Sequence, residues 1–210
     1  IFFFYSKKYK HLVLSVLAII VFSSISLVNT ILNKDQKYFI VYNINKTTAI
    51  NLIDNRDNLL FANVDSISIK NIEFTAKNNW LKKGLDNERY VNLSSGKESL
   101  LTNITSINNP NIFYKKKFIS FDETKIFILD NDFNFLITDE SFKKIYVDYL
   151  VLSNSPEISL KEISLCFSFK RIIIDSSNSL KSVESWNDEN QSLNFDLYDV
   201  RLKGAFVLKI

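Results

Sequence analysis

The stretch RIIIDSSNSLKSVESW (residues 171–186) decides the fold of this 210-residue chain. Its first part, Arg171–Asp175, is a short apolar run between charged residues, which predicts a strand buried on both faces. The SSN that follows consists of residue types that cap helices, and we expect a helix from there to about Gln191. A buried strand followed by a capped amphipathic helix is the unit from which α/β sheets are built. The apolar residues of this helix recur at spacings of three, as on one helical face: Leu180, Val183 and Trp186.

A second strand–helix unit precedes this one. YVDYLVLS (Tyr146–Ser153) is apolar enough to be a buried strand. Ser159–Phe169 then predicts a helix, in which Ser159 is the N-cap and Glu162 completes a capping box. Two such units in succession indicate a sheet with helices packed on it.

Further strands are predicted on both sides of these two units. Upstream, we expect Ile112–Phe121 and Lys125–Asp130 to form a hairpin across residues 122–124. Downstream, we expect Phe195–Val200 and Ala205–Ile210 to be strands joined by a short connection.

The segments nearer the N-terminus predict a β-meander and a helix. Lys37–Asn43, Thr47–Ile53 and Asn58–Asn63 are short, rich in aromatic and β-branched residues, and separated by polar residues. Asp65–Trp80 fits a helical face and, in its first residues, a strand; we favour the helix. Asn87–Asn111 is dominated by polar residues and predicts short strands and turns. Together these patterns predict an α/β domain with a mixed sheet and helices on its faces.

An uncharged stretch precedes this domain, from Leu12 to Leu32. As a helix it would be about 31 Å long at roughly 1.5 Å per residue, the thickness of a bilayer core. Because Lys7, Lys8 and Lys10 come before it, the positive-inside rule predicts a cytoplasmic-side loop and transmembrane helix (1–33) and an extracytoplasmic domain (34–210) at the inner, cytoplasmic membrane. A cleavable signal peptide is the alternative, although its apolar region is usually shorter. Since the chain has no Met, even at position 1, we expect it to be a piece of a longer protein.

The composition excludes several kinds of chemistry. With three Gly, one Cys and one His, the chain has no Gly-rich phosphate loop, no internal disulfide and no histidine metal cluster. The histidine, His11, lies at the start of the apolar stretch, so no serine of the outer domain has an imidazole base. Cys166 falls on an apolar helical face, which favours a small buried side chain over a reactive thiol. Asp175 ends a buried strand before a capped helix, which favours a structural role.

Positive charge is local in the outer domain. Beyond the three N-terminal lysines, acidic and basic residues balance, whereas proteins that bind phosphates usually carry a net basic face. Two segments nevertheless place aromatic residues beside lysines, the pattern for stacking single-stranded bases along a charged groove. Solvated loops with an anchoring tryptophan are the competing interpretation. The candidate DNA contacts are Trp80, Lys82, Lys83, Lys115, Lys116 and Lys117.

The succession of four segments resembles the C-terminal, metallo-β-lactamase-like domain of ComEC-type competence proteins, the membrane channels that carry transforming DNA inward. FIVYNINKTTAINLID (39–54) is similar to its opening hairpin, and YVDYLVLSNSP (146–156) to the buried strand before its metal-binding turn. The stretch at 171–186 is similar to its closing helix, and LYDVRLKGAFVL (197–208) to its final hairpin. The resemblance covers 37–210 and implies an αββα fold with mixed sheets. It also implies three partners: the membrane, the upstream channel region of the same protein and single-stranded DNA.

The residues that hold metal in this family are replaced. Active members bind one or two metal ions through an HxHxDH cluster and further His and Asp ligands, and the metal activates water for phosphodiester hydrolysis. This chain has Asn154 and Ser155 where the family places a His-His-Gly turn, and YNINKT (42–47) where it places a DVGQGD-like turn. Asp130 is similar in position to the metal-bridging Asp of the family, although the interpretation that we favour is a strand-end Asp that bonds a local turn. Asp130, Asn154 and Ser155 are therefore relict metal-site positions, and we expect a catalytically inactive domain without metal or cofactor.

Three functions follow from this sequence. The first is a structural, gating or DNA-guiding domain of a DNA-uptake channel. The second is a nuclease in which Asp130 and neighbouring carboxylates hold Mg²⁺ or Mn²⁺, which accept oxygen ligands without histidine. The third is a generic single-pass protein with a periplasmic interaction domain.

Overall fold

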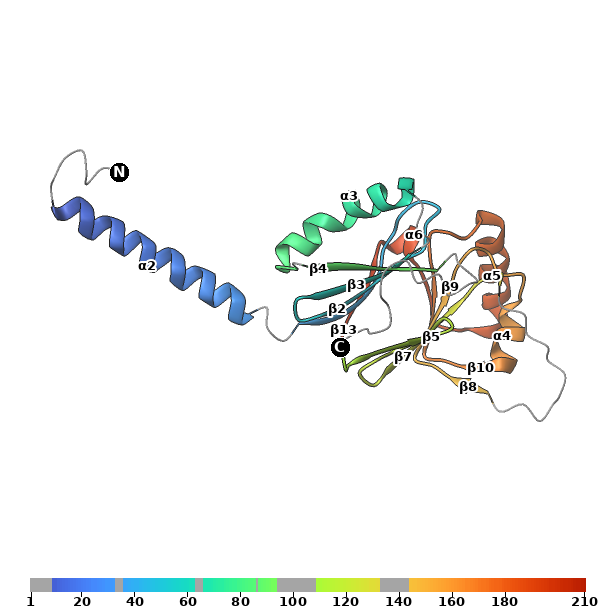
Figure 1. Cartoon of the computed structure of the whole chain (residues 1–210). Coiled ribbons are helices and arrows are strands. Elements are labelled where there is room, and N and C mark those ends of the chain that lie inside the picture. Colours follow the sequence, from blue (N-terminus) through green and yellow to red (C-terminus); the bar gives the residue numbers. More distant parts are fainter. Residues whose placement is uncertain (1–8, 33–35, 63–65, 86, 94–108, 133–143) are drawn as a thin grey trace.

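The computed structural model of the chain describes residues 9–32, 36–62, 66–85, 87–93, 109–132 and 144–210 (Figure 1). The first element is a long helix, α2 (Tyr9–Leu32), which confirms that the apolar stretch is helical. Its large apolar side chains are exposed wherever the structure describes them. Among the helices of the described segments, none has both the length and the apolarity needed to cross a membrane.

The first sheet contains five strands in the order β13–β1–β2–β3–β4. Strands β1, β2 and β3 pair antiparallel, which confirms the predicted meander. Strand β4 pairs parallel with β3, and the crossover between them is the helix α3 (Ser66–Lys82), as the sequence favoured. The strands are β1 (Lys37–Val41), β2 (Ala49–Asp54), β3 (Asp57–Ala62), β4 (Asn87–Asn92) and β13 (Phe206–Lys209).

The second sheet contains six strands in the order β12–β11–β9–β7–β6–β5. Strands β7, β9, β11 and β12 are parallel neighbours, whereas β5 and β6 continue the sheet antiparallel. The strands are β5 (Ile112–Lys115), β6 (Phe118–Phe121), β7 (Thr124–Leu129), β9 (Tyr149–Leu152), β11 (Arg171–Ile174) and β12 (Leu197–Asp199). The remaining elements are a small parallel pair, β8 (Ile145–Tyr146) with β10 (Phe167–Ser168), and the helices α4 (Leu160–Cys166), α5 (Leu180–Leu193) and α6 (Val200–Lys203).

Three apolar clusters stack these elements into four layers. The largest lies between the two sheets and joins Ile50 of β2 to Ile128 of β7. A second packs the other face of the second sheet against α4 and α5, through residues such as Trp186. A third packs the first sheet against α3, through Ile53 and Ile72. Figure 1 shows the resulting order, with α3 outside one sheet and α4 and α5 outside the other. Both faces of β2 are buried, which explains its nearly continuous apolar sequence.

Two predicted strands are interrupted. The expected strand Ile112–Phe121 turns back at Lys116 and Lys117, whose φ angles are 46° and 68°. Ile112 and Ile119 both face the inter-sheet core. In one continuous strand their odd spacing would place them on opposite faces, so a turn between them is required. Likewise, the expected strand Tyr146–Ser153 is divided into β8 and β9.

Two helix boundaries and one strand pairing also differ from the sequence prediction. The cap of α5 is Ser179, one residue after the SSN, and its hydroxyl accepts the N–H of Ser182. Helix α4 has the predicted capping box but ends at Cys166, where the chain enters β10. The predicted final hairpin is wrong, because β12 pairs with β11 in one sheet and β13 pairs with β1 in the other. Helix α6 and Gly204, whose φ is +84°, carry the chain across.

Candidate functional site

The carboxyl ends of four parallel strands meet at one edge of the second sheet, which we call the carboxyl edge. The last residues of β7, β9, β11 and β12 are in register with their neighbours along this edge. Ligands of open α/β sheets bind outside such strand ends. Asp130 directly follows β7, and Asn154 and Ser155 come shortly after β9. The fold therefore brings the three relict positions to one edge, on neighbouring strands.

Asp175, directly after β11, is a buried and extensively hydrogen-bonded side chain of the carboxyl edge. It is 1% exposed. Its carboxylate accepts hydrogen bonds from the Ser153 hydroxyl (2.6 Å), the Ser177 N–H (2.9 Å), the Asn178 amide (3.1 Å) and the Ser177 hydroxyl. Burial raises the pKa of Asp175, against hydrogen bonds from Ser153, Ser177 and Thr48 that lower it. Neutral donors of the protein thus surround a carboxylate that faces inward, which supports its predicted structural role.

The relict positions after β9 join two loops of the edge. Asn154 and Ser155 both have left-handed backbone, with φ of 56° and 52°. The N–H of Asn154 donates to the Ser177 hydroxyl (2.7 Å), and the N–H of Ser155 donates to the Asn178 side chain (2.8 Å). The Ser155 hydroxyl accepts the N–H of Ser179, the cap of α5, at 2.6 Å. Asn154 and Ser155 therefore connect the loop after β9 to the loop after β11.

The turn between β1 and β2 reaches this edge from the other sheet. The N–H of Lys46 donates to the Ser176 carbonyl (3.1 Å), and the Ser176 hydroxyl donates to the Asn43 side chain (2.6 Å). The Thr48 hydroxyl donates to the Ser177 hydroxyl (3.1 Å). The β1–β2 turn of the first sheet is therefore hydrogen-bonded to the loop after β11 of the second sheet.

Arg201 on α6 also contacts the carboxyl edge, and no sequence pattern predicted this contact. Its guanidinium donates to the carbonyls of Ser176 (3.0 Å) and Asn178 (2.5 Å). A lone arginine in a strand connection gives no sequence signal for such a contact, because its partners lie more than twenty residues away.

Asp130 is paired with an ammonium group. Its side chain is 7% exposed, and the Nζ of Lys117 lies against its Oδ1. The same Nζ is 3.4 Å from Asp132 Oδ2, and the N–H of Asp132 donates to Asp130 (3.2 Å). A predicted DNA contact and a predicted relict metal position are therefore partners of each other.

The other predicted DNA contacts are distributed over two parts of the fold. Lys115, the last residue of β5, and Lys116, in the β5–β6 turn, are exposed, whereas Lys82 is exposed and Lys83 half-buried at the end of α3. The Nζ of Lys83 lies over the Tyr38 ring, 3.3 Å from its centroid. The first pair lies in the second sheet, whereas the second pair lies at the end of α3, which packs on the first sheet. No described contact brings the two pairs into one groove.

Trp80 is a core residue. It is 1% exposed, and its indole N–H contacts the Asn51 side chain (2.9 Å) and the Tyr42 hydroxyl (3.2 Å). A ring enclosed between α3 and the first sheet presents no face to a nucleic-acid base. The anchoring interpretation of this tryptophan fits the structure, and the stacking interpretation does not.

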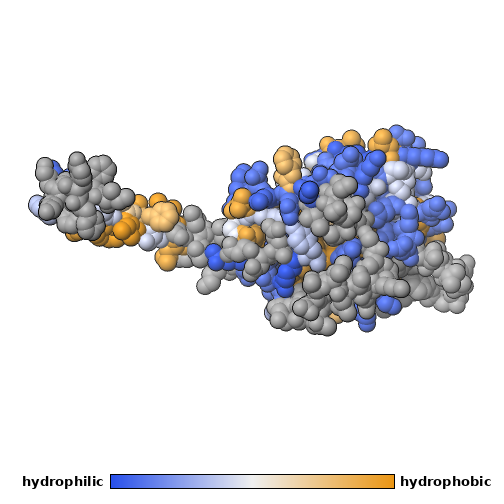
Figure 2. All heavy atoms as spheres, turned by 45° about the horizontal axis from the view of Figure 1, so that its top comes forward, coloured by the Kyte–Doolittle hydropathy of each residue, from blue (hydrophilic) through white to orange (hydrophobic). Residues whose placement is uncertain are grey.

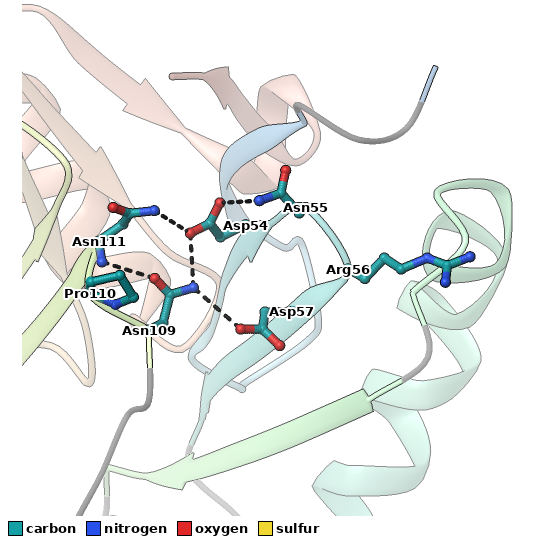
Figure 3. Close-up of a pocket in the computed structure, with 7 residues that line it drawn as sticks. All are labelled: Asp54, Asn55, Arg56, Asp57, Asn109, Pro110 and Asn111. Atoms are coloured by element: carbon teal, nitrogen blue, oxygen red, sulfur yellow. Dashed lines mark hydrogen bonds between the residues drawn. The ribbon is translucent and has the colours of Figure 1, made fainter. Parts of the chain in front are cut away.

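An open pocket of about 400 Å³ lies beside the β2–β3 turn (Figure 3). Asp54 accepts hydrogen bonds from the amides of Asn109 and Asn111, both at 2.8 Å. Asp57 pairs with Arg89 at 3.2 Å. In Figure 3, Arg56 points away from the carboxylates of Asp54 and Asp57. The pocket is lined by Asp54, Asn55, Arg56, Asp57, Asn109, Pro110 and Asn111. Across the residues that the structure describes, no three His, Cys, Asp or Glu side chains are grouped so that they could hold a metal ion.

Comparison with known proteins places the chain in a family. It matches no curated protein and no solved structure at a significant level. The family model of the ComEC C-terminal domain matches residues 39–210. That range contains every described helix after α2 and all of both sheets except the first two residues of β1. The chain therefore belongs to the ComEC C-terminal domain family.

Proposed function

We propose that this domain serves DNA uptake as a structural and gating part of a ComEC-type membrane channel and does not hydrolyse nucleic acid. The family implies the role in competence and DNA uptake. The observation that carries the loss of catalysis is the pairing of Lys117 with Asp130. A metal ion at this aspartate would have to displace the ammonium, and its binding would then include the free-energy cost of leaving a largely buried Lys117 without its partner.

The four-layer order supports a degenerate metallo-β-lactamase-like scaffold. Two mixed sheets lie face to face, and helices cover the outer face of each. The relict positions lie together at the edge where an α/β sheet binds ligands. Hydroxyls and amides there hold loops, as the contacts of Asn154 and Ser155 illustrate.

Helix α2 is proposed to anchor the domain in the inner membrane. Its sequence from Leu12 to Leu32 is uncharged, and its described apolar side chains have no protein cover. The lysines before it favour an extracytoplasmic domain. The proposed partners are the membrane and the upstream channel region of the same protein. A guiding role for single-stranded DNA is assigned to the exposed lysines Lys115 and Lys116.

Metal content and strand cleavage test the loss of catalysis. The full chain, purified in detergent, is assayed for bound divalent metal and for cleavage of single-stranded DNA with Mg²⁺ and with Mn²⁺. We expect no cleavage above a protein-free control. Cleavage that Asp130→Ala abolishes and Asp132→Ala, its exposed neighbour, preserves would establish the carboxylate nuclease instead.

Salt-dependent binding tests the guiding role. Each phosphate contact contributes about 0.7 to the slope of log affinity against log salt for a single strand. Replacing Lys115 and Lys116 by Gln should therefore lower that slope by about 1.4. The same change at Lys161 and Lys181, exposed on α4 and α5, should leave it unchanged. Equal effects of the two pairs would refute the assignment.

A further inference from the structure

Helix α3 turns two large apolar side chains away from the protein. Ile72, Ala76 and Trp80 recur at spacings of four and are buried against the first sheet. At about 100° per residue, Phe74 and Leu81 lie on the opposite side of the helix. Phe74 is 88% exposed and Leu81 is 67% exposed. This helix therefore has a buried apolar face and, directly opposite, a second apolar pair in contact with solvent.

Lysines flank this exposed pair. Lys70 and Lys77 lie along the same stripe, and Lys82 follows Leu81; all three are exposed. The acidic residue of α3, Glu73, is half-buried at the side of the helix. We call Lys70, Phe74, Lys77, Leu81 and Lys82 the outer face of α3. Figure 2 shows isolated apolar side chains standing among hydrophilic ones on the side of the domain that carries this helix. Apolar side chains within a basic surface are typical of helices that lie in the plane of a membrane.

The end of α3 is close to the point where the chain arrives from α2. The side-chain amide of Gln36 donates to the Lys83 carbonyl (2.7 Å) and to the Asn55 carbonyl (2.8 Å). Three residues, 33–35, lie between Gln36 and Leu32, the last residue of α2. The four Cα–Cα steps from Leu32 to Gln36, at 3.8 Å each, span at most about 15 Å. The Lys82 end of α3 is therefore close to the point where the chain leaves α2.

We propose that the outer face of α3 docks on the anionic surface of the membrane that holds α2. Phe74 and Leu81 enter the interfacial region, while Lys70, Lys77 and Lys82 face the lipid phosphates. This inference rests on the proposed anchoring by α2. Each lysine near an anionic leaflet adds attraction, and the tether keeps the local concentration of lipid high. Docking would fix the orientation of the two sheets over the membrane.

Depth-dependent quenching tests the docking. A fluorophore is attached at Asn78→Cys, an exposed position on α3, and in a second protein at Asn187→Cys, an exposed position on α5. Cys166 is buried and is retained. The full chain is reconstituted into phosphatidylcholine vesicles with and without phosphatidylglycerol, using acyl-brominated lipid as quencher. We expect quenching at position 78 in anionic vesicles only, and none at position 187.

Two variants separate the contributions of charge and apolar contact. Replacing Lys70 and Lys77 by Gln should lower the affinity of the domain for anionic vesicles by a factor on the order of 30, since each lysine contributes a factor of about five to that affinity. Phe74→Ser with Leu81→Ser should also abolish the quenching, whereas Leu180→Ser with Leu202→Ser, exposed apolar residues elsewhere, should preserve it. Flotation with the vesicles measures anchoring by α2 separately. If the protein floats with the vesicles but shows no quenching at position 78, the docking is refuted. The docking is also refuted if the fluorophore at position 78 responds to single-stranded DNA and not to lipid. If the protein does not float, the anchoring by α2 is refuted.

Discussion

Lys117 and Asp130 connect the turn after β5 to the end of β7 by an ion pair that is largely closed to solvent. Their side chains are 17% and 7% exposed. Asp132 contributes a second, more exposed carboxylate to the same ammonium. The pair therefore lies at the carboxyl edge, directly after β7.

Replacing Lys117 by Met should destabilise the domain strongly. Removal of one partner of a buried pair leaves the other charge uncompensated, at a cost of about 3 kcal/mol. Urea unfolding followed by circular dichroism measures this loss. The double variant Lys117→Met with Asp130→Asn should recover most of it, and Lys116→Met, an exposed neighbour, should cost less than about 0.5 kcal/mol. Equal losses at Lys116 and Lys117 would show that the pair has no special role.

Asp148 should make the domain more stable at neutral pH than in acid. Although burial raises its pKa, hydrogen bonds from the Lys125 N–H (2.8 Å), Lys170 and Tyr146 outweigh this and lower the pKa below 3.8. A group with a depressed pKa stabilises the fold above its unfolded pKa and loses this effect as the pH falls through the folded value. We expect Asp148→Asn to cost about 2 kcal/mol at pH 7, and the cost to shrink below about pH 4. Unfolding free energies across pH 3–7 check this.

Asp175 should show the opposite pH dependence. Burial raises its pKa above 3.8, so its contribution is fully present below that value and is lost as the pH rises through the raised folded value. Relative to Asp175→Asn, the wild-type protein should therefore become more stable on acidification. The free energy of unfolding of both proteins from pH 4 to pH 8 gives the measurement. A difference that stays constant over this range would contradict the raised pKa.

The cap of α4 should contribute measurably. The Ser159 hydroxyl accepts the N–H of Glu162, and the Glu162 carboxylate accepts the N–H of Ser159. These hydrogen bonds also lower the pKa of Glu162. Ser159→Ala should cost about 1 kcal/mol, as N-cap removals do. Ser192→Ala, at the exposed end of α5, is the matched control and should change stability little.

Trp80 fluorescence should report a core environment and ignore nucleic acid. In a Trp186→Phe background, its emission should be blue-shifted and unchanged by single-stranded DNA. Trp80→Phe removes the hydrogen bonds to Asn51 and Tyr42 and should cost about 2 kcal/mol. Quenching of Trp80 by added DNA would restore the stacking interpretation.

Much of the fold follows from local patterns in the sequence. The capping box at Ser159 and the buried run Arg171–Asp175 identify their elements because caps and periodicity act within a few residues. The turn at Lys116 and Lys117 could have been predicted, because one continuous strand would place Ile112 and Ile119 on opposite faces of the sheet. The placement of β12 and β13 in different sheets depends on long-range pairing, which local patterns do not encode.

The candidate site was only partly predictable. That Asp130 and Asn154 share an edge follows from the parallel pairing of β7 and β9. The partnership of Lys117 with Asp130 and the reach of Arg201 to Ser176 depend on how separate loops meet, and neither residue type nor spacing identifies such contacts. Trp80 lies close to Lys82 and Lys83 in the sequence, which predicted a DNA contact. Neighbouring residues of a helix point to different sides, however, and Trp80 points into the core.

The position of β1 between β2 and β13 has a mechanical consequence. β1 is the first strand after α2, and it is hydrogen-bonded along both of its edges. A pull along the strand from α2 loads these bonds in shear, so that they must fail together instead of unzipping one at a time. A force that reaches the start of β1 is therefore shared between two neighbouring strands and passes directly into the first sheet.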